Sequence, residues 1–361
     1  MIRLGRSRRV APTVAVASAA VVLAVVVLAG CGGGGADAGA ARPAAGRTLR
    51  SATTPRISAA PVTTTGALPA VDRTYAVGVR TEAYVDPSRT TSAIPGYAGA
   101  PNRTFPVTVW YPVTGDPNAA VVENAPPDRS GGPYPLVVFA HGYAVTPQFY
   151  EELLQQWAAA GYVVAAPTYP LLSGVPAGPS HEDYSKVFAD TSFVLTRLLA
   201  DLGSGPGSHP LAGLVDPTRV GAAGQSDGEV VSYGLGALVC CRDARVKSVV
   251  SMAGILGNVA NPVEHDNGVP VLHLVGSADE LQPYDDAIAW DRANLSAPRW
   301  MVTVVGGNHD QPYRNPASPY FDGVVRMTTD FLDGTLKSRP DRLLRIDAYV
   351  SDNASRFRLE R

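Results

Sequence analysis

This sequence has few lysines and a small net charge. Three of its 361 residues are lysine, and its 30 basic residues are offset by 32 acidic ones, giving a formal net charge of −2. No basic stripe runs along the chain. This argues against a nucleic-acid partner, because proteins that bind nucleic acids gather Lys and Arg on one face. Hydrophobic residues make up 45% of the chain, which is enough to bury a full core.

Cysteine is also rare, with three in the chain. Cys240 and Cys241 are adjacent, and we predict that they are two buried core thiols. The alternative is a strained vicinal disulfide, which an oxidising compartment allows. A metal site on this pair would need further ligands that the surrounding sequence does not offer. We therefore expect neither a metal nor a cofactor.

A long hydrophobic run, residues 10–29, lies near the N-terminus behind four arginines. The sequence Leu28-Ala29-Gly30-Cys31 closes it and resembles the lipobox of bacterial lipoproteins. The resemblance implies that residues 1–30 are a signal peptide and that lipidation of Cys31 anchors the mature protein to the membrane. The alternative is an uncleaved transmembrane helix, since about 20 apolar residues can span a bilayer. Both place the remaining chain outside the cytoplasm, at the outer face of the cytoplasmic membrane.

Residues 31–71 are dominated by Gly, Ala, Thr, Ser and Pro. Such a segment cannot bury enough apolar surface to offset the entropy lost on folding. We therefore predict a flexible tether over residues 31–71 and one folded domain over residues 72–361, which we expect to be monomeric.

Strand-like and helix-like segments alternate in that domain. Two runs rich in β-branched and aromatic residues predict antiparallel strands at 74–86 and 104–113. Continuous apolar runs, typical of strands buried on both faces, follow at 134–142, 162–170, 219–225, 246–254, 269–277 and 299–307. Helical spacing occurs at 147–161, 184–203, 227–238, 284–295 and 322–337, the last being the final element expected. The pattern predicts an α/β fold, a mostly parallel sheet with helices on both faces.

One serine lies between two glycines at the junction of a predicted strand and a predicted helix. In Gly224-Gln225-Ser226-Asp227-Gly228, small residues stand two positions away on each side of the serine. This is the pattern of a nucleophile elbow, a sharp turn that lifts the serine hydroxyl clear of the sheet and leaves no room for larger neighbours. The alternative is an ordinary serine that caps a helix.

A nucleophilic serine needs a base, and the base needs an orienting carboxylate. Asp279 and His309 follow the next buried runs, so both are expected at the sheet edge that holds Ser226. Glu280 is the neighbouring acid but lies one residue further on. His273 falls inside a strand, where we expect a packed core residue.

The tetrahedral intermediate of such a reaction needs an oxyanion hole. We expect its donors to be the backbone N–H groups of Asp227 and of Tyr143, which follows the run 134–142. A carboxylate beside the nucleophile would disfavour a developing anion. We therefore expect the Asp227 side chain to point outward, where the helix dipole favours an acid. The alternative is that this side chain helps to hold the Tyr143 loop.

These motifs together resemble the α/β-hydrolase superfamily. The segments "PLVVFAHGY", "DPTRVGAAGQSDG", "VPVLHLVGSADELQP" and "GGNHD" occur in the order that the superfamily shows. The layout is similar to a lidless group that includes chlorophyllases, platelet-activating-factor acetylhydrolase-like esterases and cutinase-type polyester hydrolases. The resemblance implies a serine esterase that acts through an acyl-enzyme on a small-molecule or lipid-like ester, with a catalytic Ser226, Asp279 and His309. Residues 171–184 are the best candidate for a small cap.

Two other functions remain open on the sequence. One is a peptidase or amidase that uses the same three residues. The other is a non-catalytic lipoprotein that binds a hydrophobic ligand, in which the three side chains would fail to meet.

Overall fold

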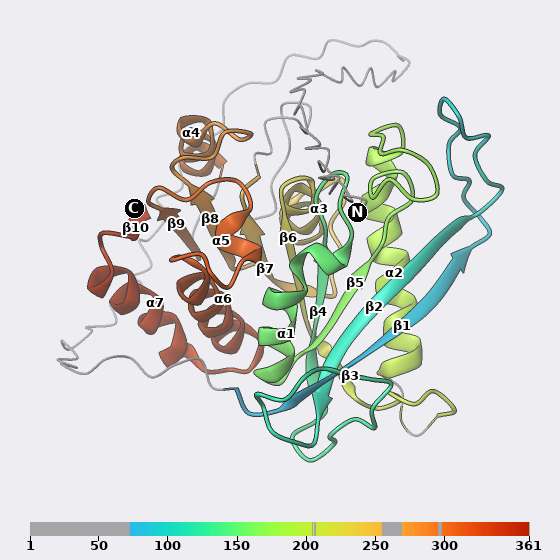
Figure 1. Ribbon diagram of the computed structural model, residues 1–361, viewed down its shortest axis with the longest axis horizontal. Helices are drawn as coiled ribbons and strands as arrows, with labels where there is room; N and C mark the ends of the chain where they lie inside the picture. Colours follow the sequence, from blue (N-terminus) through green and yellow to red (C-terminus); the bar gives the residue numbers. More distant parts are fainter. Residues whose placement is uncertain (1–72, 204, 206, 255–268, 295–297, 361) are drawn as a thin grey trace, which may run out of the picture. The chain divides into compact units, whose positions relative to one another are not determined.

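A ten-stranded sheet forms the centre of the part of the chain that the structure describes, residues 73–360 apart from 204, 206, 255–268 and 295–297. In this computed structural model the strand order is β10-β9-β8-β7-β6-β4-β5-β2-β1-β3 (Figure 1). The strands are β1 (Ala76–Asp86), β2 (Arg103–Val113), β3 (Val122–Glu123), β4 (Tyr134–Ala140), β5 (Val163–Pro167), β6 (Val215–Gln225), β7 (Val246–Met252), β8 (Val271–Gly276), β9 (Arg299–Val304) and β10 (Phe357–Glu360).

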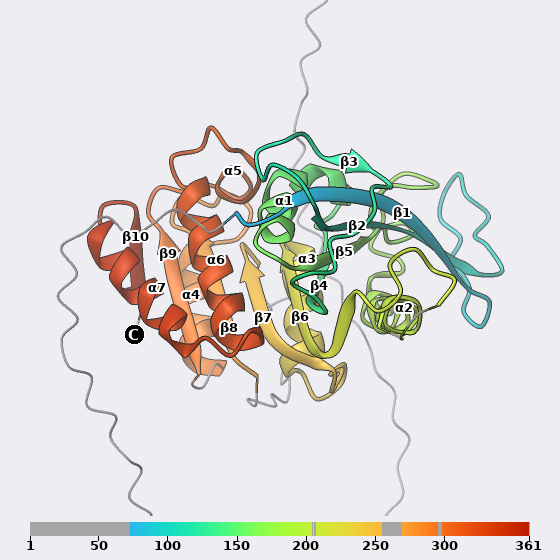
Figure 2. The same ribbon diagram turned by 90° about the horizontal axis from the view of Figure 1, so that it is seen from below.

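The central strands β5, β4, β6, β7, β8 and β9 are parallel, and β1 and β2 form a long antiparallel ribbon beside them (Figure 2). Strands β4, β5 and β8 are buried at every position, as expected for strands covered on both faces. The predicted α/β fold class is therefore confirmed.

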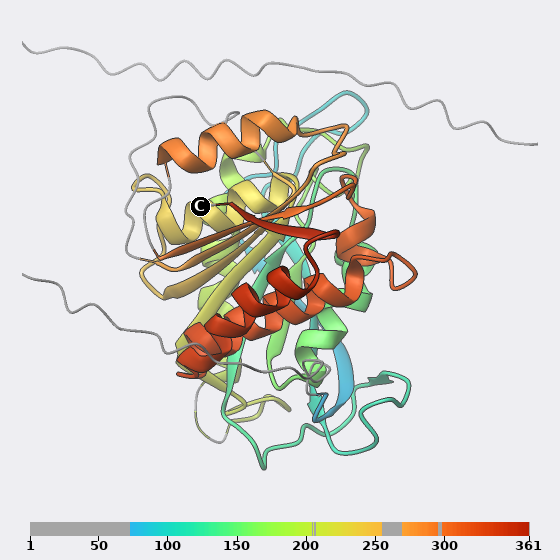
Figure 3. The ribbon, with the colours of Figure 1, turned by 90° about the vertical axis from the view of Figure 1, so that its left-hand side faces the viewer.

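Helices cover both faces of the sheet. The described helices are η1 (Pro147–Tyr150), α1 (Glu151–Ala159), η2 (Tyr184–Lys186), α2 (Val187–Leu202), α3 (Asp227–Ala237), α4 (Tyr284–Asn294), α5 (Gln311–Arg314), α6 (Phe321–Leu336) and α7 (Pro340–Asp352). Apolar side chains of α2 and α3 pack in one core cluster, and those of α1, α6 and α7 pack in another. Figure 3 shows α3 and α4, in yellow and orange, on the opposite side of the sheet from the red α6 and α7.

Two elements follow the helix that we expected to be last. Helix α7 buries only Arg342, Ile346 and Val350, and its remaining positions are partly or fully exposed. Strand β10 lies at the sheet edge, antiparallel to β9, and only Phe357 is buried. Helix α7 does repeat apolar residues at helical spacing, at Leu343, Ile346 and Val350, but this stripe is short and charged residues lie between its members; β10 has only four residues.

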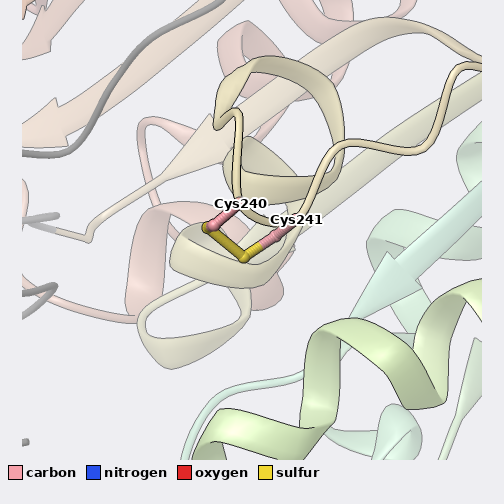
Figure 4. The surroundings of a disulfide bond; sticks show 2 residues. All are labelled: Cys240 and Cys241. Atoms are coloured by element: carbon pink, nitrogen blue, oxygen red, sulfur yellow. A yellow bond between two sulfur atoms is a disulfide. The ribbon is translucent and has the colours of Figure 1, made fainter. Parts of the chain in front are cut away.

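The two adjacent cysteines are joined. Cys240 and Cys241 form a disulfide in the turn after α3 (Figure 4). The prediction of two buried thiols is wrong, because the chain turns to the surface here: Val239 is 55% exposed and Cys240 is also exposed.

The proposed signal peptide, Cys31 and the tether lie outside the described residues, so the predicted domain boundaries stay predictions. Within the described ranges, no helix has both the length and the apolar character needed to cross a bilayer.

Candidate active site

Ser226 occupies a strained turn between β6 and α3. Its φ of 59° and ψ of −127° lie in a region that residues other than glycine rarely adopt. A Cβ atom on Gly224 would lie 2.0 Å from the carbonyl oxygen of Gly228, and one on Gly228 would lie 2.0 Å from that of Ala140. The turn therefore has room only for glycine at both positions.

The structure brings Ser226, His309 and Asp279 together. His309 Nε2 lies 2.9 Å from Ser226 Oγ, and His309 Nδ1 lies 2.8 Å from Asp279 Oδ2. Asp279 and His309 are 8% and 7% exposed, so the contact between them is almost fully shielded from water. The spacing allows the imidazole to accept the hydroxyl proton while the carboxylate holds its other nitrogen.

Local hydrogen bonds fix both partners of the serine. Asp279 Oδ1 accepts bonds from the backbone N–H groups of Leu281 at 2.9 Å and Gln282 at 2.8 Å. The side-chain amide of Gln225 donates to the carbonyl oxygen of His309 at 2.8 Å. Glu280, the alternative acid, is exposed.

The loop that follows β4 lies against the nucleophile. A Cβ atom on Gly142 would stand 3.1 Å from Ser226 Cβ, so the loop backbone passes close to the reacting hydroxyl. The Tyr150 hydroxyl donates to Gln225 Oε1 at 2.6 Å and accepts the Gly142 N–H at 3.2 Å. Tyr143, the predicted oxyanion donor, is the next residue, and the other predicted donor, Asp227, begins α3.

A buried histidine holds the same loop. His141 Nε2 accepts the N–H of Tyr169 at 3.1 Å, and Nδ1 donates to the Gly142 carbonyl at 2.7 Å. Complete burial lowers the pKa of His141 to about 4, so its ring is neutral at pH 7. Sequence reasoning assigned His141 to this loop but missed Tyr150, Gln225 and Tyr169, which come from three other parts of the chain.

The side chain of Asp227 does not point outward, so that expectation is wrong. Its Oδ2 lies 2.6 Å from His181 Nε2, and its backbone carbonyl accepts the Tyr184 hydroxyl at 2.8 Å. The ring of His181 in turn stacks on Tyr143, with centroids 4.2 Å apart and planes 9° apart. His181 therefore links the two residues that carry the predicted oxyanion donors.

His181 and Tyr184 belong to residues 171–184, the segment predicted as a small cap, which we term the cap loop. Arg103 of β2 is fully buried and anchors the end of this loop through Asp183, at 2.5 Å. The same guanidinium binds Asp190 of α2, with Nε 2.8 Å from Oδ1. The cap loop is thus fixed to the body of the fold on the side of the oxyanion loop.

His273 is buried inside β8, as expected, but it has charged neighbours. Its Nε2 lies 3.4 Å from Glu229 Oε1, and its Nδ1 lies 3.9 Å from Asp291 Oδ1. Burial alone would lower the pKa of His273, but the two carboxylates outweigh it and raise the pKa to about 10. This buried charged group lies beside the site but does not contact the three reacting side chains. In the residues described, no cluster of His, Cys, Asp and Glu side chains is arranged to hold a metal ion.

Comparisons with known proteins show what this chain is similar to. The family model for chlorophyllase matches residues 106–235, a stretch that contains the oxyanion loop and Ser226. Among solved structures, a ferulic acid esterase from Streptomyces cinnamoneus superposes with a TM-score of 0.55 at 24% identity, covering 73% of this chain and 91% of the other. No curated protein sequence matches the chain. The chain therefore has the α/β-hydrolase fold, and residues 106–235 are similar to chlorophyllase.

Proposed function

We propose that this protein is a serine hydrolase that cleaves carboxylic esters through an acyl-enzyme. The observation that carries the proposal is the continuous contact from Ser226 Oγ through His309 to Asp279, at 2.9 Å and 2.8 Å. A non-catalytic binding protein has no need for this alignment or for a strained serine, which costs on the order of 1–3 kcal/mol.

The proposed reaction uses each of these atoms in turn. Ser226 Oγ bonds to the ester carbonyl carbon as His309 Nε2 takes its proton, and Asp279 stabilises the resulting imidazolium. The carbonyl oxygen becomes an oxyanion, which accepts hydrogen bonds from the N–H groups of Tyr143 and Asp227. His309 then gives the proton to the departing alkoxide as the ester C–O bond breaks. A water molecule, activated by His309 in the same way, releases the acid from Ser226.

The surroundings of the site support esters with an apolar part. Tyr143, in the loop after β4, is 39% exposed, and Leu281, two residues after Asp279, is 61% exposed, so both offer apolar surface to a ligand. Exposed apolar side chains beside a reactive centre favour contact with an apolar acyl or alcohol group.

A substitution series tests the proposal. Wild-type protein is expected to hydrolyse p-nitrophenyl esters and to be labelled covalently by a fluorophosphonate. Ser226→Ala should abolish both activities. Ser232→Ala, which changes a buried serine of the following helix α3, should abolish neither. A folded wild-type protein that stays unlabelled would rule the proposal out. Parallel p-nitroanilide assays separate an esterase from an amidase, and we expect the ester to react much faster.

We further propose that lipidation of Cys31 anchors the enzyme outside the cytoplasm. The lipobox-like sequence before Cys31 supports this. In a bacterial host, the wild-type protein should then take up labelled palmitate and sediment with membranes. Cys31→Ser should take up none, and labelling of that variant equal to the wild type would contradict the proposal.

A further inference from the structure

A buried hydrogen-bond chain connects the oxyanion loop, which follows β4, to the residue that carries the catalytic imidazole. It begins at the N–H of Gly142, passes through the Tyr150 hydroxyl and the Gln225 side chain, and ends at the carbonyl oxygen of His309. Its donor–acceptor distances are 3.2 Å, 2.6 Å and 2.8 Å in that order. Tyr150 and Gln225 are 1% and 2% exposed, so water has almost no access to these bonds.

The direction of each bond in this hydrogen-bond chain is fixed. Complete burial raises the pKa of Tyr150, so its hydroxyl keeps its proton and donates to Gln225 Oε1. The amide must then turn its NH₂ group toward the His309 carbonyl, because a flipped amide would set two acceptor oxygens against each other. Position 225 therefore needs a side chain with an acceptor on one side and a donor on the other.

At one end, the hydrogen-bond chain fixes the peptide that carries a predicted oxyanion donor. Gly142 donates its N–H to Tyr150, and its C=O accepts from His141 Nδ1 at 2.7 Å. That C=O and the N–H of Tyr143 belong to one planar trans peptide unit, so they point in opposite directions. Because Gly142 is held on both sides, the direction of the Tyr143 N–H is set as well.

At the other end, the hydrogen-bond chain holds the residue that supplies the base. The His309 carbonyl accepts from Gln225, while the imidazole of the same residue reaches Ser226 Oγ at 2.9 Å. Gln225 is also the residue directly before Ser226, at the end of β6. This one side chain therefore relates the positions of the nucleophile, the base and the oxyanion loop.

A second contact joins the same two segments nearer the surface. The Arg314 guanidinium lies 4.3 Å from the centroid of the Phe149 ring, and Arg314 Nε lies 2.9 Å from Asp310 Oδ2. Phe149 precedes Tyr150, and Asp310 follows His309. The Arg314 and Asp310 side chains are 31% and 29% exposed, so solvent weakens their attraction. The buried hydrogen-bond chain is therefore the stronger constraint on the two segments.

We propose that Gln225 is a positioning residue that holds the oxyanion loop and His309 at the spacing that the reaction needs. This inference rests on the proposed ester hydrolysis and adds a residue that takes no part in the bond changes themselves. A misplacement of about 1 Å can slow an enzyme by about 10²-fold, so loss of the hydrogen-bond chain lowers kcat. KM is unaffected, because the Gln225 side chain is buried and does not contact the substrate.

Two variants of the full-length protein break the hydrogen-bond chain at different bonds. Gln225→Met keeps the length of the side chain without the amide, and Tyr150→Phe keeps the ring without the hydroxyl. Each should lower kcat for p-nitrophenyl acetate by about 10- to 100-fold and leave KM within about twofold, as expected for an interaction that acts in the transition state. The double variant should be little slower than the slower single variant, because either change interrupts the same hydrogen-bond chain.

Tyr162→Phe is the matched control. Tyr162 is also fully buried and donates at 2.6 Å, to Asp333, but it lies before β5, at the sheet edge opposite Ser226. This variant should lower the melting temperature and keep the wild-type kcat.

Three results would overturn the inference: an equal fall of kcat in Tyr162→Phe and Tyr150→Phe, kcat within about twofold of the wild type in both Gln225→Met and Tyr150→Phe, or additive losses in the double variant. If Gln225→Met does not fold, Tyr150→Phe and its control still decide. A wild-type protein that neither hydrolyses the ester nor is labelled by a fluorophosphonate would instead refute the proposed hydrolysis itself, so the two failures are distinguishable.

Discussion

Replacing His181 by alanine should slow the reaction without unfolding the protein. His181 joins the two residues with the predicted oxyanion donors, through a 2.6 Å contact to Asp227 and a stacked contact with Tyr143 at 4.2 Å. The side chains of His181 and Asp227 are 43% and 18% exposed, so solvent screens this pair. Such a pair contributes about 0.2–1 kcal/mol, and an aromatic stack contributes about 0.5–1.5 kcal/mol.

These magnitudes set the size of the expected effect. If the sum of about 0.7–2.5 kcal/mol holds the two N–H groups in place in the transition state, its loss lowers kcat/KM by about 3- to 70-fold. His181→Phe keeps the stacked ring and should recover part of the rate. His181→Gln keeps a donor for Asp227 but loses the ring, so each variant isolates one contact.

The assay is kcat/KM for p-nitrophenyl acetate, together with the rate constant for fluorophosphonate labelling and the melting temperature. The control is His209→Ala, since His209 Nε2 also contacts a carboxylate, Glu82, at 3.2 Å but lies away from Ser226. Both rates should fall together for His181→Ala and stay unchanged for the control. Rates within twofold of the wild type for His181→Ala would refute the argument that His181 holds the two oxyanion donors in place.

Two further predictions concern the elbow and its supporting loop. Gly228→Ala should abolish fluorophosphonate labelling of Ser226, because the new Cβ would lie 2.0 Å from a backbone oxygen. Gly178→Ala is the control and should be labelled normally, because a Cβ there has no atom within 4 Å. Equal labelling of the two variants would contradict the packing argument. His141, with its pKa lowered to about 4 by burial, stays neutral in the folded state while the unfolded chain gains a proton below about pH 6.5. The free energy of unfolding should therefore fall as the pH is lowered from 6.5 to 4, by as much as about 3 kcal/mol. Urea titrations should show a shallower pH dependence of this free energy for His141→Gln than for the wild type. The same pH dependence in both proteins would contradict the assignment to His141.

The order of the sheet and helices could be predicted because buried parallel strands leave an unmistakable mark in the sequence. Strands such as β4 and β8 are apolar at nearly every position, and the helices between them repeat apolar residues every three or four positions. The strand ends then indicated where reactive side chains would gather. That is why Ser226, Asp279 and His309 could be proposed together from residues far apart in the chain.

What could not be predicted depends on contacts between distant segments. No local pattern signals that His181 meets Asp227, 46 residues later, or that Arg103 meets Asp190, 87 residues later. Helix α7 was missed because its apolar stripe, Leu343, Ile346 and Val350, is short and interrupted by charged residues. The state of the two cysteines was predicted wrongly because their adjacency in the sequence does not show whether the turn after α3 is buried or exposed.

The cap loop has a consequence for how the substrate range of this enzyme can change. The N–H of Ser180 donates to the carbonyl of Leu171 at 2.9 Å, so the loop is closed at its base by its own backbone. Its far end is held separately, by Arg103 through Asp183. Leu172 is buried and its carbonyl accepts the Ala144 N–H at 2.8 Å, but residues 174–178 are partly or fully exposed, so we expect this shorter stretch to tolerate changes of length and sequence. Natural divergence or laboratory evolution could therefore change this part of the cap loop without changing Ser226, Asp279 or His309.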